Sequence, residues 1–555
     1  MHKAIGIPVL FALASMMPLA SAAEFSEESA GSFSGQEFRI NTFEPGDQRV
    51  PLVASTGDGR SVVVWQSRNQ TAPGWAIYAQ RLDAQVALVG DEIQVNDFNT
   101  GSQDGQSLVM APDGSFAVAW NGQDRSSEMD VISVRRFGAD GMPLASDRRI
   151  SETTGEIQLL PRLGLTDDNQ LVISWEQSSE ATGFDILSRR ADATGSAVGP
   201  IASLNVSSSG AQRRADLAVG DDGSVVAVWQ DALLDGSDWG VFLRCLDSAG
   251  QGPAETQVNQ FTNGQQLRPR VARADDGRFA VVWQDTMGLS SFDYRRIMAR
   301  LFDPSCQPLG PELQVNQFDD AIQDQPAIAV DGSGNYVLAW QSFPEDFERQ
   351  GIYARRLGRD GQFISDEFRV SQELEAFQDF PSVSVLDDDG YLFAWESAGQ
   401  DESGFGIFAR RFAGPLGADL RVLSGAGQVA PINEPFEQAL RIEVLDQWGQ
   451  VRINEPVRIS SFGDSAGVLF ANGQPVIEAQ TNELGQVAFE MTANSVPGEF
   501  VLRVETPRSG EQQEVALENL LSSGRSAPIP VPTLGPLVLL ILILLTLLLG
   551  RTRLC

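Results

Sequence analysis

The sequence predicts an all-β protein: a seven-bladed β-propeller of four-stranded blades, then a small β-sandwich and a C-terminal transmembrane helix. Three observations predict this fold. A strand-like stretch that contains a tryptophan, first seen as "GRSVVVWQS" at 59–67, occurs seven times at intervals of 54 to 57 residues. Asp-Gly pairs, which favour tight antiparallel hairpins, precede most of these stretches. Finally, 17 apolar residues from Leu534 to Gly550 lie near the end of the chain.

The first 23 residues have the features of a secretory signal peptide. Lys3 is basic, an apolar run follows from Ala4 to about Leu19, and small residues stand at 20–22. We therefore expect residues 1–23 to be removed and the rest of the chain to be exported.

Residues 36–413 carry the seven repeats. Their tryptophans are Trp65, Trp120, Trp175, Trp229, Trp283, Trp340 and Trp395. A fixed period of this size indicates a repeat architecture, and a ring of four-stranded units buries faces that one unit alone leaves exposed. Two copies of the outer strand, "EFRIN" at 37–41 and "ADLRVLS" at 418–424, are candidates for completing the last blade. A linear array of sandwiches is the alternative, but 55 residues is short for a sandwich of about 100 residues.

Positions that are the same in every repeat are expected to serve the framework. A glutamine stands 17 residues before each tryptophan, and we expect these seven side chains to hydrogen-bond the backbone of a loop. One strand position carries Arg135, Arg189, Arg244, Arg300, Arg355 and Arg410, which we expect to form ion pairs or hydrogen bonds within the framework. Cys245 occupies the next position and is predicted to be a free thiol, although a bond to Cys306 is left open.

Function is expected where the repeats differ, which is in the segments that follow each tryptophan. These loops leave one face of the disc, and binding residues are often found on loops of a rigid scaffold. Aromatic rings beside carboxylates suit carbohydrate. The candidate ligand-binding residues are Trp75, Phe184, Trp239 and Phe405, which share one register, and Phe292 and Tyr294, which lie in the longest loop. The alternative is that the four residues of shared register only cover the hairpin ends.

Composition excludes several chemistries. His2 and Lys3 are the only histidine and lysine, and both fall in the expected signal peptide. Serine–histidine and cysteine–histidine catalysis, histidine metal sites, Schiff bases and a P-loop lysine are then excluded, and carboxylate chemistry remains. A net charge of −34 makes nucleic acid a poor partner. We expect no cofactor and no metal site, although diffuse calcium binding is compatible with this acidity, since "DGSGN" at 331–335 and "DDDG" at 387–390 lack EF-hand spacing.

Residues 418–507 follow a different β pattern without the repeat. Asp446 to Gly449, Thr481 with Gly485-Gln486-Val487-Ala488, and Pro497-Gly498-Glu499-Phe500 resemble the bacterial Ig-like domains of invasin and intimin type. The resemblance implies a spacer or adhesive module without chemistry of its own. Residues 508–530 are predicted to be a flexible linker.

Residues 531–555 contain Val531, Pro532, Thr533 and Leu534, then the apolar run, then Arg551 and Arg553. This order resembles the IPTL-CTERM sorting signals that exosortases process. The resemblance implies a temporary membrane anchor and partners in the export and processing machinery. A permanent anchor is the alternative.

These observations together predict a noncatalytic binding or adhesion protein of the cell surface or extracellular matrix, whose propeller face binds polysaccharide or another envelope component. An enzyme is not expected, because the Ser-x-Asp-x-Gly-x-Thr-Trp box of sialidase propellers is absent. The alternatives are a carboxylate-based glycoside hydrolase or lyase on the same face, and a structural matrix protein.

Overall fold

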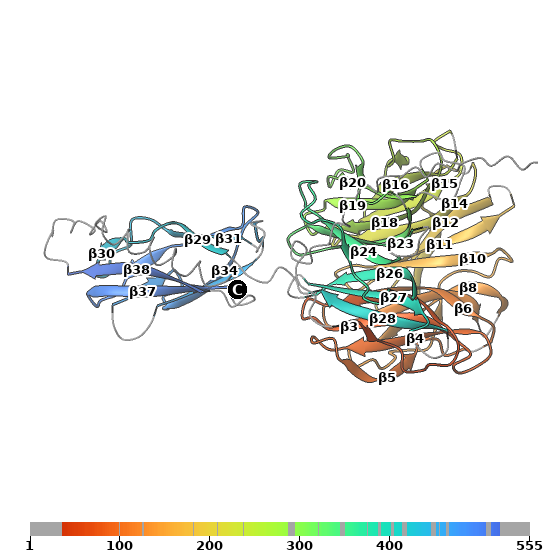
Figure 1. Cartoon of the computed structure of the whole chain (residues 1–555), viewed down its shortest axis with the longest axis horizontal. Coiled ribbons are helices and arrows are strands. Elements are labelled where there is room, and N and C mark those ends of the chain that lie inside the picture. The colour runs from red at the N-terminus through yellow and green to blue at the C-terminus, as the bar shows by residue number, and fades with distance from the viewer. Residues whose placement is uncertain are drawn as a thin grey trace, which may run out of the picture. The chain divides into compact units, whose positions relative to one another are not determined.

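Figure 1 shows a computed structural model of the chain. It describes residues 36–521, except for short gaps at 99, 125–126, 181–182, 208, 237, 287–294, 320, 345–349, 375, 387–389, 401–403, 413–418, 446–450, 454, 462–465 and 507–511. Strands are the regular elements of this part of the chain. The chain divides into two compact units, of which the first runs to Gly417 and the second begins at Ala418.

The described residues of the first unit form seven four-stranded antiparallel sheets, which we call blades (Figure 1). Blade 1 consists of β2 (Gln48–Ser55), β3 (Ser61–Arg68), β4 (Trp75–Leu82) and β5 (Leu88–Gln94). Blades 2 to 4 consist of β6 (Gln103–Met110), β7 (Phe116–Asp124), β8 (Ser127–Phe137) and β9 (Arg148–Arg149); β10 (Gln158–Leu165), β11 (Leu171–Ser179), β12 (Gly183–Ala191) and β13 (Ala197–Ser203); and β14 (Gln212–Val219), β15 (Val225–Asp231), β16 (Gly240–Leu246) and β17 (Thr256–Gln257). Blades 5 to 7 consist of β18 (Gln266–Arg273), β19 (Phe279–Asp285), β20 (Arg296–Phe302) and β21 (Leu313–Gln314); β22 (Ala321–Val330), β23 (Tyr336–Pro344), β24 (Gly351–Leu357) and β25 (Phe368–Arg369); and β26 (Phe377–Val385), β27 (Tyr391–Ala398), β28 (Phe405–Phe412) and β1 (Phe38–Arg39).

The tryptophan strand of each blade is apolar on both faces because neighbouring blades cover both. In β15, for example, all seven residues are buried. One core cluster joins Val64 and Ile77 of blade 1 to Val118 and Trp120 of blade 2. The first strands of the seven blades, β2, β6, β10, β14, β18, β22 and β26, line one central cavity. This is the arrangement of a β-propeller.

The last blade is completed by β1, the first of the two candidate strands. Phe38 pairs with Ala409, and the backbone N–H of Ile40 donates to Ile407 O at 2.8 Å. The second candidate, β29 (Asp419–Ser424), instead pairs with β31 (Leu440–Leu445) in the second unit. Sequence repeats and sheets are therefore out of phase by one strand, because the outer strand of each blade begins the following repeat.

A buried amide at this closure makes it testable. Asn41 Oδ1 accepts the N–H of Ile407 at 2.7 Å, and Asn41 Nδ2 donates to Phe43 O at 2.9 Å. We expect Asn41→Ala to lower the free energy of unfolding by about 2 kcal/mol, because it leaves a buried N–H without its acceptor. Urea unfolding measures this change. A loss no larger than that of an exposed Asn→Ala change, such as Asn472→Ala, would show that β1 does not stabilise the ring.

The glutamines and arginines of the repeats serve the framework, as predicted. All seven glutamines are buried. Gln103, for instance, donates to Thr100 O at 3.2 Å and accepts the indole N–H of Trp120 at 2.8 Å. Each of the six arginines donates to a main-chain carbonyl at the outer strand of the preceding blade, as Arg135 does to Val95 O at 2.7 Å.

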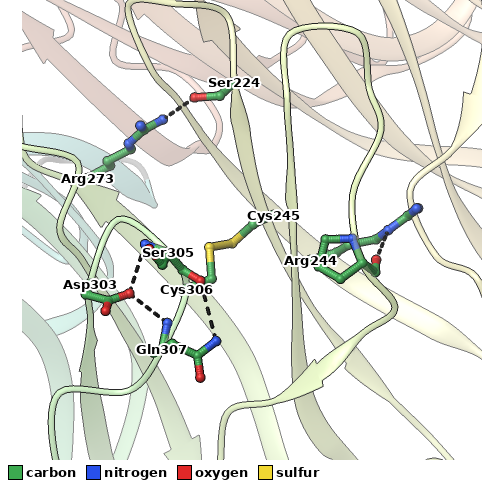
Figure 2. Close-up of a disulfide and its surroundings, with 9 residues drawn as sticks. Ser224, Arg244, Cys245, Arg273, Asp303, Ser305, Cys306 and Gln307 are labelled. Atoms are coloured by element: carbon green, nitrogen blue, oxygen red, sulfur yellow. Dashed lines mark hydrogen bonds between the residues drawn. A yellow bond between two sulfur atoms is a disulfide. The ribbon is translucent and has the colours of Figure 1, made fainter.

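The prediction of a free thiol at Cys245 is wrong. Cys245 forms a disulfide with Cys306, 61 residues along the chain (Figure 2). In blade 3, Arg190 occupies the position equivalent to Cys245 and donates to Gly223 O of the following blade at 2.9 Å. The disulfide likewise joins blade 4 to blade 5, so a covalent bond replaces a hydrogen bond between blades.

The second unit is a separate, small β structure. A three-stranded sheet contains β29, β31 and β35 (Gln486–Phe489). A five-stranded sheet contains β30 (Val429–Pro431), β38 (Gln512–Leu520), β37 (Gly498–Glu505), β32 (Pro456–Ser461) and β34 (Val476–Gln480), and β33 (Val468–Phe470) pairs with β36 (Met491–Ala493). Its core includes Ile442, Val457, Ile459, Leu502 and Val504.

The prediction of a flexible linker from residue 508 is wrong at its beginning. Gln512–Leu520 form β38, which pairs with β37 along its length. Val515 and Leu517 are buried in the core of the second unit, while Gln512, Glu514 and Ala516 are exposed. The polar composition of this segment concealed a strand with a single apolar face.

Both predicted targeting segments lie outside the described residues. These include the signal peptide at 1–23 and the sorting signal with Val531, Pro532, Thr533, Leu534, Arg551 and Arg553. Within residues 36–521, as far as they are described, no helix has the length and apolar character to cross a membrane.

Candidate functional site

A ring of seven strand bulges surrounds one end of the central cavity. In every blade, the second residue after the buried glutamine has a positive φ, and the pairing with the tryptophan strand shifts there. These residues are Val50, Gly105, Leu160, Arg214, Arg268, Gln325 and Phe380, with φ between 51° and 64°. A left-handed backbone is costly for residues other than glycine, so the surrounding structure has to hold it.

The residue after each tryptophan helps to stabilise this backbone conformation. In five blades its side chain reaches the following blade and accepts the N–H of the bulge residue. Asn121 Oδ1 accepts from Leu160 at 3.2 Å, and Gln230 Oε1 accepts from Arg268 at 2.9 Å. A side chain of the neighbouring blade, usually an amide, thus accepts a hydrogen bond from the bulge.

In two blades the side chain that accepts the N–H of the bulge is a glutamate. Glu396 accepts the N–H of Val50 at 2.7 Å and is paired with Arg49, whose Nε lies 2.9 Å from Oε1. The guanidinium of Arg49 also lies 4.1 Å from the ring centroid of Phe405. The same three contacts recur for Glu176, which binds the N–H of Arg214 and pairs with Arg213, which stacks at 4.2 Å on Phe184. Because this arrangement occurs twice, we assign it to the framework.

Asp379 distinguishes the surroundings of Glu396 from those of Glu176. It is directly opposite Glu396 in the strand pair of blade 7, whereas the apolar Leu159 is opposite Glu176 in blade 3. Like charges opposite each other destabilise a sheet. Burial, then the charge of Glu396, then that of Asp324 raise the pKa of Asp379 from 3.8 to about 7. Asp379 is therefore a carboxylic acid that keeps its proton near neutral pH.

Asp324 occupies the equivalent position in the neighbouring blade 6, one residue after its glutamine. Arg295 forms an ion pair with one of its carboxylate oxygens, and Nε of Arg268 lies 3.6 Å from the other. The N–H of Gln325 also donates to it at 2.7 Å. Two arginines and a backbone N–H thus contact the carboxyl group of Asp324, whereas acidic neighbours raise the pKa of Asp379 in the next blade.

Aromatic rings lie beside the protonated carboxyl. Phe377 precedes Asp379 by two residues, which places both side chains on one face of β26, and it is 42% exposed. Its ring contacts Phe343 at a centroid distance of 4.8 Å and Phe405 at 6.4 Å. An exposed ring next to carboxyl groups can stack on the C–H face of a sugar.

The predicted ligand-binding residues are not brought together. Trp75, Phe184, Trp239 and Phe405 are half-buried and belong to four different blades. Arginine guanidinium groups lie against Trp75, Phe184 and Phe405, which fits the alternative that these rings cover hairpin ends. Phe405 alone adjoins Asp379 through Phe377, and Phe292 and Tyr294 lie outside the described residues. A ligand role for the six stays a prediction.

Sequence reasoning missed Asp379, Asp324 and Phe377. A signal existed, because the position after the repeated glutamine differs between repeats. It is occupied in order by Arg49, Asp104, Leu159, Arg213, Leu267, Asp324 and Asp379. The described residues contain no cluster of three or more histidine, cysteine or acidic side chains that could hold a metal ion.

Comparisons with known proteins give matches among solved structures. No protein-family model matches the sequence, and no characterised protein gave a match. Among similar solved structures, the α-L-arabinanase of Penicillium chrysogenum has a TM-score of 0.40 and 13% identity over 56% of this chain and 92% of its own. The NanB sialidase of Streptococcus pneumoniae gives 0.39 and 10%, with coverages of 70% and 72%. The β-propeller domain of the Trilobed protease from Pyrococcus furiosus gives 0.40 and 10%, with coverages of 66% and 94%.

These comparisons correct one expectation. The arabinanase and the sialidase are glycoside hydrolases, which goes against the prediction of a noncatalytic binding or adhesion protein, and that prediction is withdrawn. At 10 to 13% identity the likeness concerns the fold alone. The chemistry has to come from residues of this chain, and Asp379 is the strongest candidate among them.

Proposed function

We propose that the protein is a carboxylate-dependent glycoside hydrolase acting on extracellular polysaccharide, with its catalytic groups at the cavity mouth of a seven-bladed propeller. The observation that carries this proposal is Asp379, which burial and two acidic neighbours keep protonated up to a pH of about 7. Glycoside hydrolysis needs one carboxylic acid and one carboxylate at the scissile bond. Blades 7 and 6 supply this pair as Asp379 and Asp324.

The two groups would divide the reaction between them. Asp379 donates its proton to the glycosidic oxygen while the bond from that oxygen to the anomeric carbon breaks. Asp324, which pairs with Arg295 and Arg268, either takes a proton from the attacking water or attacks the anomeric carbon itself, which are the two roles of the second carboxylate. Phe377 supports the sugar ring, since its exposed face lies on the same side of β26 as Asp379.

The pH dependence of turnover tests this proposal. The exported chain is incubated with neutral and acidic polysaccharides, and new reducing ends are measured between pH 4 and 9. We expect turnover to fall as the pH rises through about 7, because Asp379 then loses the proton it must donate. Asp324→Asn is expected to reduce turnover at least about 100-fold, and Asp222→Asn in a hairpin of the opposite face to leave it unchanged. Unsaturated products would indicate a lyase, and no turnover of any polysaccharide would refute both.

We further propose that the chain is exported and delivered to the cell surface or matrix by its C-terminal segment, with the second unit as an Ig-like spacer. The signal-like residues 1–23 and the sorting-like residues 531–555 support this reading. Intact-mass analysis of protein from membranes and from medium tests it. A chain ending near Pro532 or Thr533 outside the cell is expected, whereas a chain confined to membranes and ending at Cys555 contradicts processing.

A further inference from the structure

The central cavity is charged on one side only. Its volume is 590 Å³, and two layers of side chains line it, from the second and fourth residues after each repeated glutamine. Blades 3 to 5 contribute Arg162, Arg214, Arg268 and Arg270 to these layers, together with Asp216, and Asp104 of blade 2 and Arg213 of blade 4 also line the cavity. The facing part, from blades 6, 7 and 1, contributes chiefly uncharged groups such as Phe380, Pro381, Ala327, Val50 and Leu52.

Acidic side chains neutralise these arginines only in part. Arg162 lies 3.4 Å from Asp216, and Arg268 lies 3.6 Å from Asp324. Arg270 donates to Pro269 O at 3.0 Å. Within the described residues, the guanidinium of Arg214 has neither a hydrogen bond nor an ion pair. A chain with a net charge of −34 thus maintains positive charge in its central cavity.

The arginines repel one another. Burial, and then the charge of Arg162, lower the pKa of Arg270 to about 9, so that it stays protonated at pH 7 under repulsion. Burial and Arg268 likewise lower the pKa of Arg214. Grouped charges of this kind cost stability, and an anion placed between them would relieve the cost.

We propose that this arginine cluster, Arg162, Arg214, Arg268 and Arg270, binds an anionic group of the polysaccharide, namely a uronate carboxylate or a sulfate ester. Planar guanidinium groups bind such oxyanions by paired hydrogen bonds. The uncharged half of the cavity accommodates the carbon skeleton of the sugar. This inference rests on the proposed function, because Phe380 lines the cavity directly after Asp379. It specifies the substrate as an acidic polysaccharide.

Other blades supply replacements for the cluster that suit the backbone. Gln325 occupies the position of Arg214 in blade 6 with φ of 51°, against 55° for Arg214, so Arg214→Gln fits this bulge. Ala327 occupies the position of Arg270, which makes Arg270→Ala a second variant. Arg278→Ser is the matched control, because Arg278 pairs with Asp276 in a hairpin at the other end of the strands and Ser224 stands there in blade 4.

Calorimetric binding of tetragalacturonate, and of a chondroitin sulfate tetrasaccharide, to the Asp379→Asn protein tests the proposal. At least one should bind, and Arg214→Gln or Arg270→Ala should weaken it at least tenfold, while Arg278→Ser should not. Fully methyl-esterified tetragalacturonate should bind at least tenfold more weakly than the free acid. Circular dichroism verifies folding, and Arg214→Lys should retain part of the affinity if charge is what matters.

Different outcomes refute different claims. Binding that is equal for acid and ester, or unchanged in both arginine variants, overturns the inference, as does inorganic sulfate binding as tightly as the tetrasaccharides. If only neutral polysaccharide is hydrolysed and neither anion binds, the inference fails and the proposed function stands. If an anion binds through the arginines but no polysaccharide is ever cleaved, the proposed function fails and the anion site stands.

Discussion

Asp379→Asn is expected to abolish hydrolysis and to stabilise the protein at pH 8. An amide cannot donate the proton that the departing sugar oxygen needs, so turnover should fall by at least about 100-fold. The same change removes a carboxyl group that is opposite Glu396 and mostly buried. A group whose loss ends activity yet raises stability is retained for function rather than for folding.

The stability change follows from the raised pKa. Asp379 binds its proton more tightly in the folded protein, where its pKa is about 7, than in the unfolded chain, where it is near 3.8. Its contribution therefore becomes unfavourable as the pH rises from about 4 to about 7, and the penalty is complete above 7. A difference of about three pKa units corresponds to about 4 kcal/mol as an upper limit for the gain from Asp379→Asn at pH 8.

Urea unfolding of the wild type and the variant at pH 5 and pH 8 measures this gain. The difference should be clearly larger at pH 8 than at pH 5, because at pH 5 only the first part of this penalty has developed. Asp222→Asn, in an exposed hairpin of blade 4, is the control and should show no such pH dependence. A variant less stable than the wild type at pH 8 would assign Asp379 to the framework, and undiminished hydrolysis would exclude it as the acid.

Removal of the disulfide is expected to have the other large effect. Cys245→Ser with Cys306→Ser frees a segment of 61 residues in the unfolded chain. The chain-entropy estimate for a loop of that length is about 4 kcal/mol of unfolding free energy. Blades 4 and 5 lose their covalent link, so thermal unfolding should begin at a lower temperature without a reductant, and a reductant should destabilise only the wild type.

A replacement taken from the other blades serves as the control. Cys245→Arg with Cys306→Ser introduces the residue that Arg190 represents in blade 3, where it donates to the carbonyls of Gly223 and Ser248. This pair of changes should recover a part of the lost stability, about 1 kcal/mol per hydrogen bond regained. Equal stability of the oxidised wild type and the double serine variant would mean that the bond constrains nothing.

The regular part of the propeller could be predicted from the sequence, because the same strand pattern recurs in every repeat. Trp65 and its six equivalents mark a buried strand, and the repeated glutamines and arginines bind backbone groups as their regularity suggested. Local patterning sufficed for these elements, since each unit packs on copies of itself. The linker prediction failed at Gln512–Leu520 because a half-exposed strand needs only a few apolar residues on one face.

The site depended on contacts between distant segments. Burial and the charges of Glu396 and Asp324 raise the pKa of Asp379, and neither acidic residue is close to it in the sequence. The sequence predicts function in the aromatic loops, which differ between repeats. The candidate catalytic residues instead occupy the single position after the repeated glutamine, where the residue type also differs between repeats. The disulfide of Cys245 could likewise not be predicted, because the sequence alone does not place this residue opposite Cys306 of the next blade.

The closure by β1 imposes an order on biosynthesis. Asn41 and Ile407, which bond to each other, are separated by 366 residues, so one edge of the ring is made long before its partner. At the usual pace of 5 to 20 residues per second, the ribosome needs roughly 20 to 70 s to reach that partner. During this interval the early strand must not pair with a wrong edge. Because β1 is only two residues long, it offers few backbone groups to a wrong strand. Once β28 has been made, Asn41 accepts the N–H of Ile407 and closes the ring.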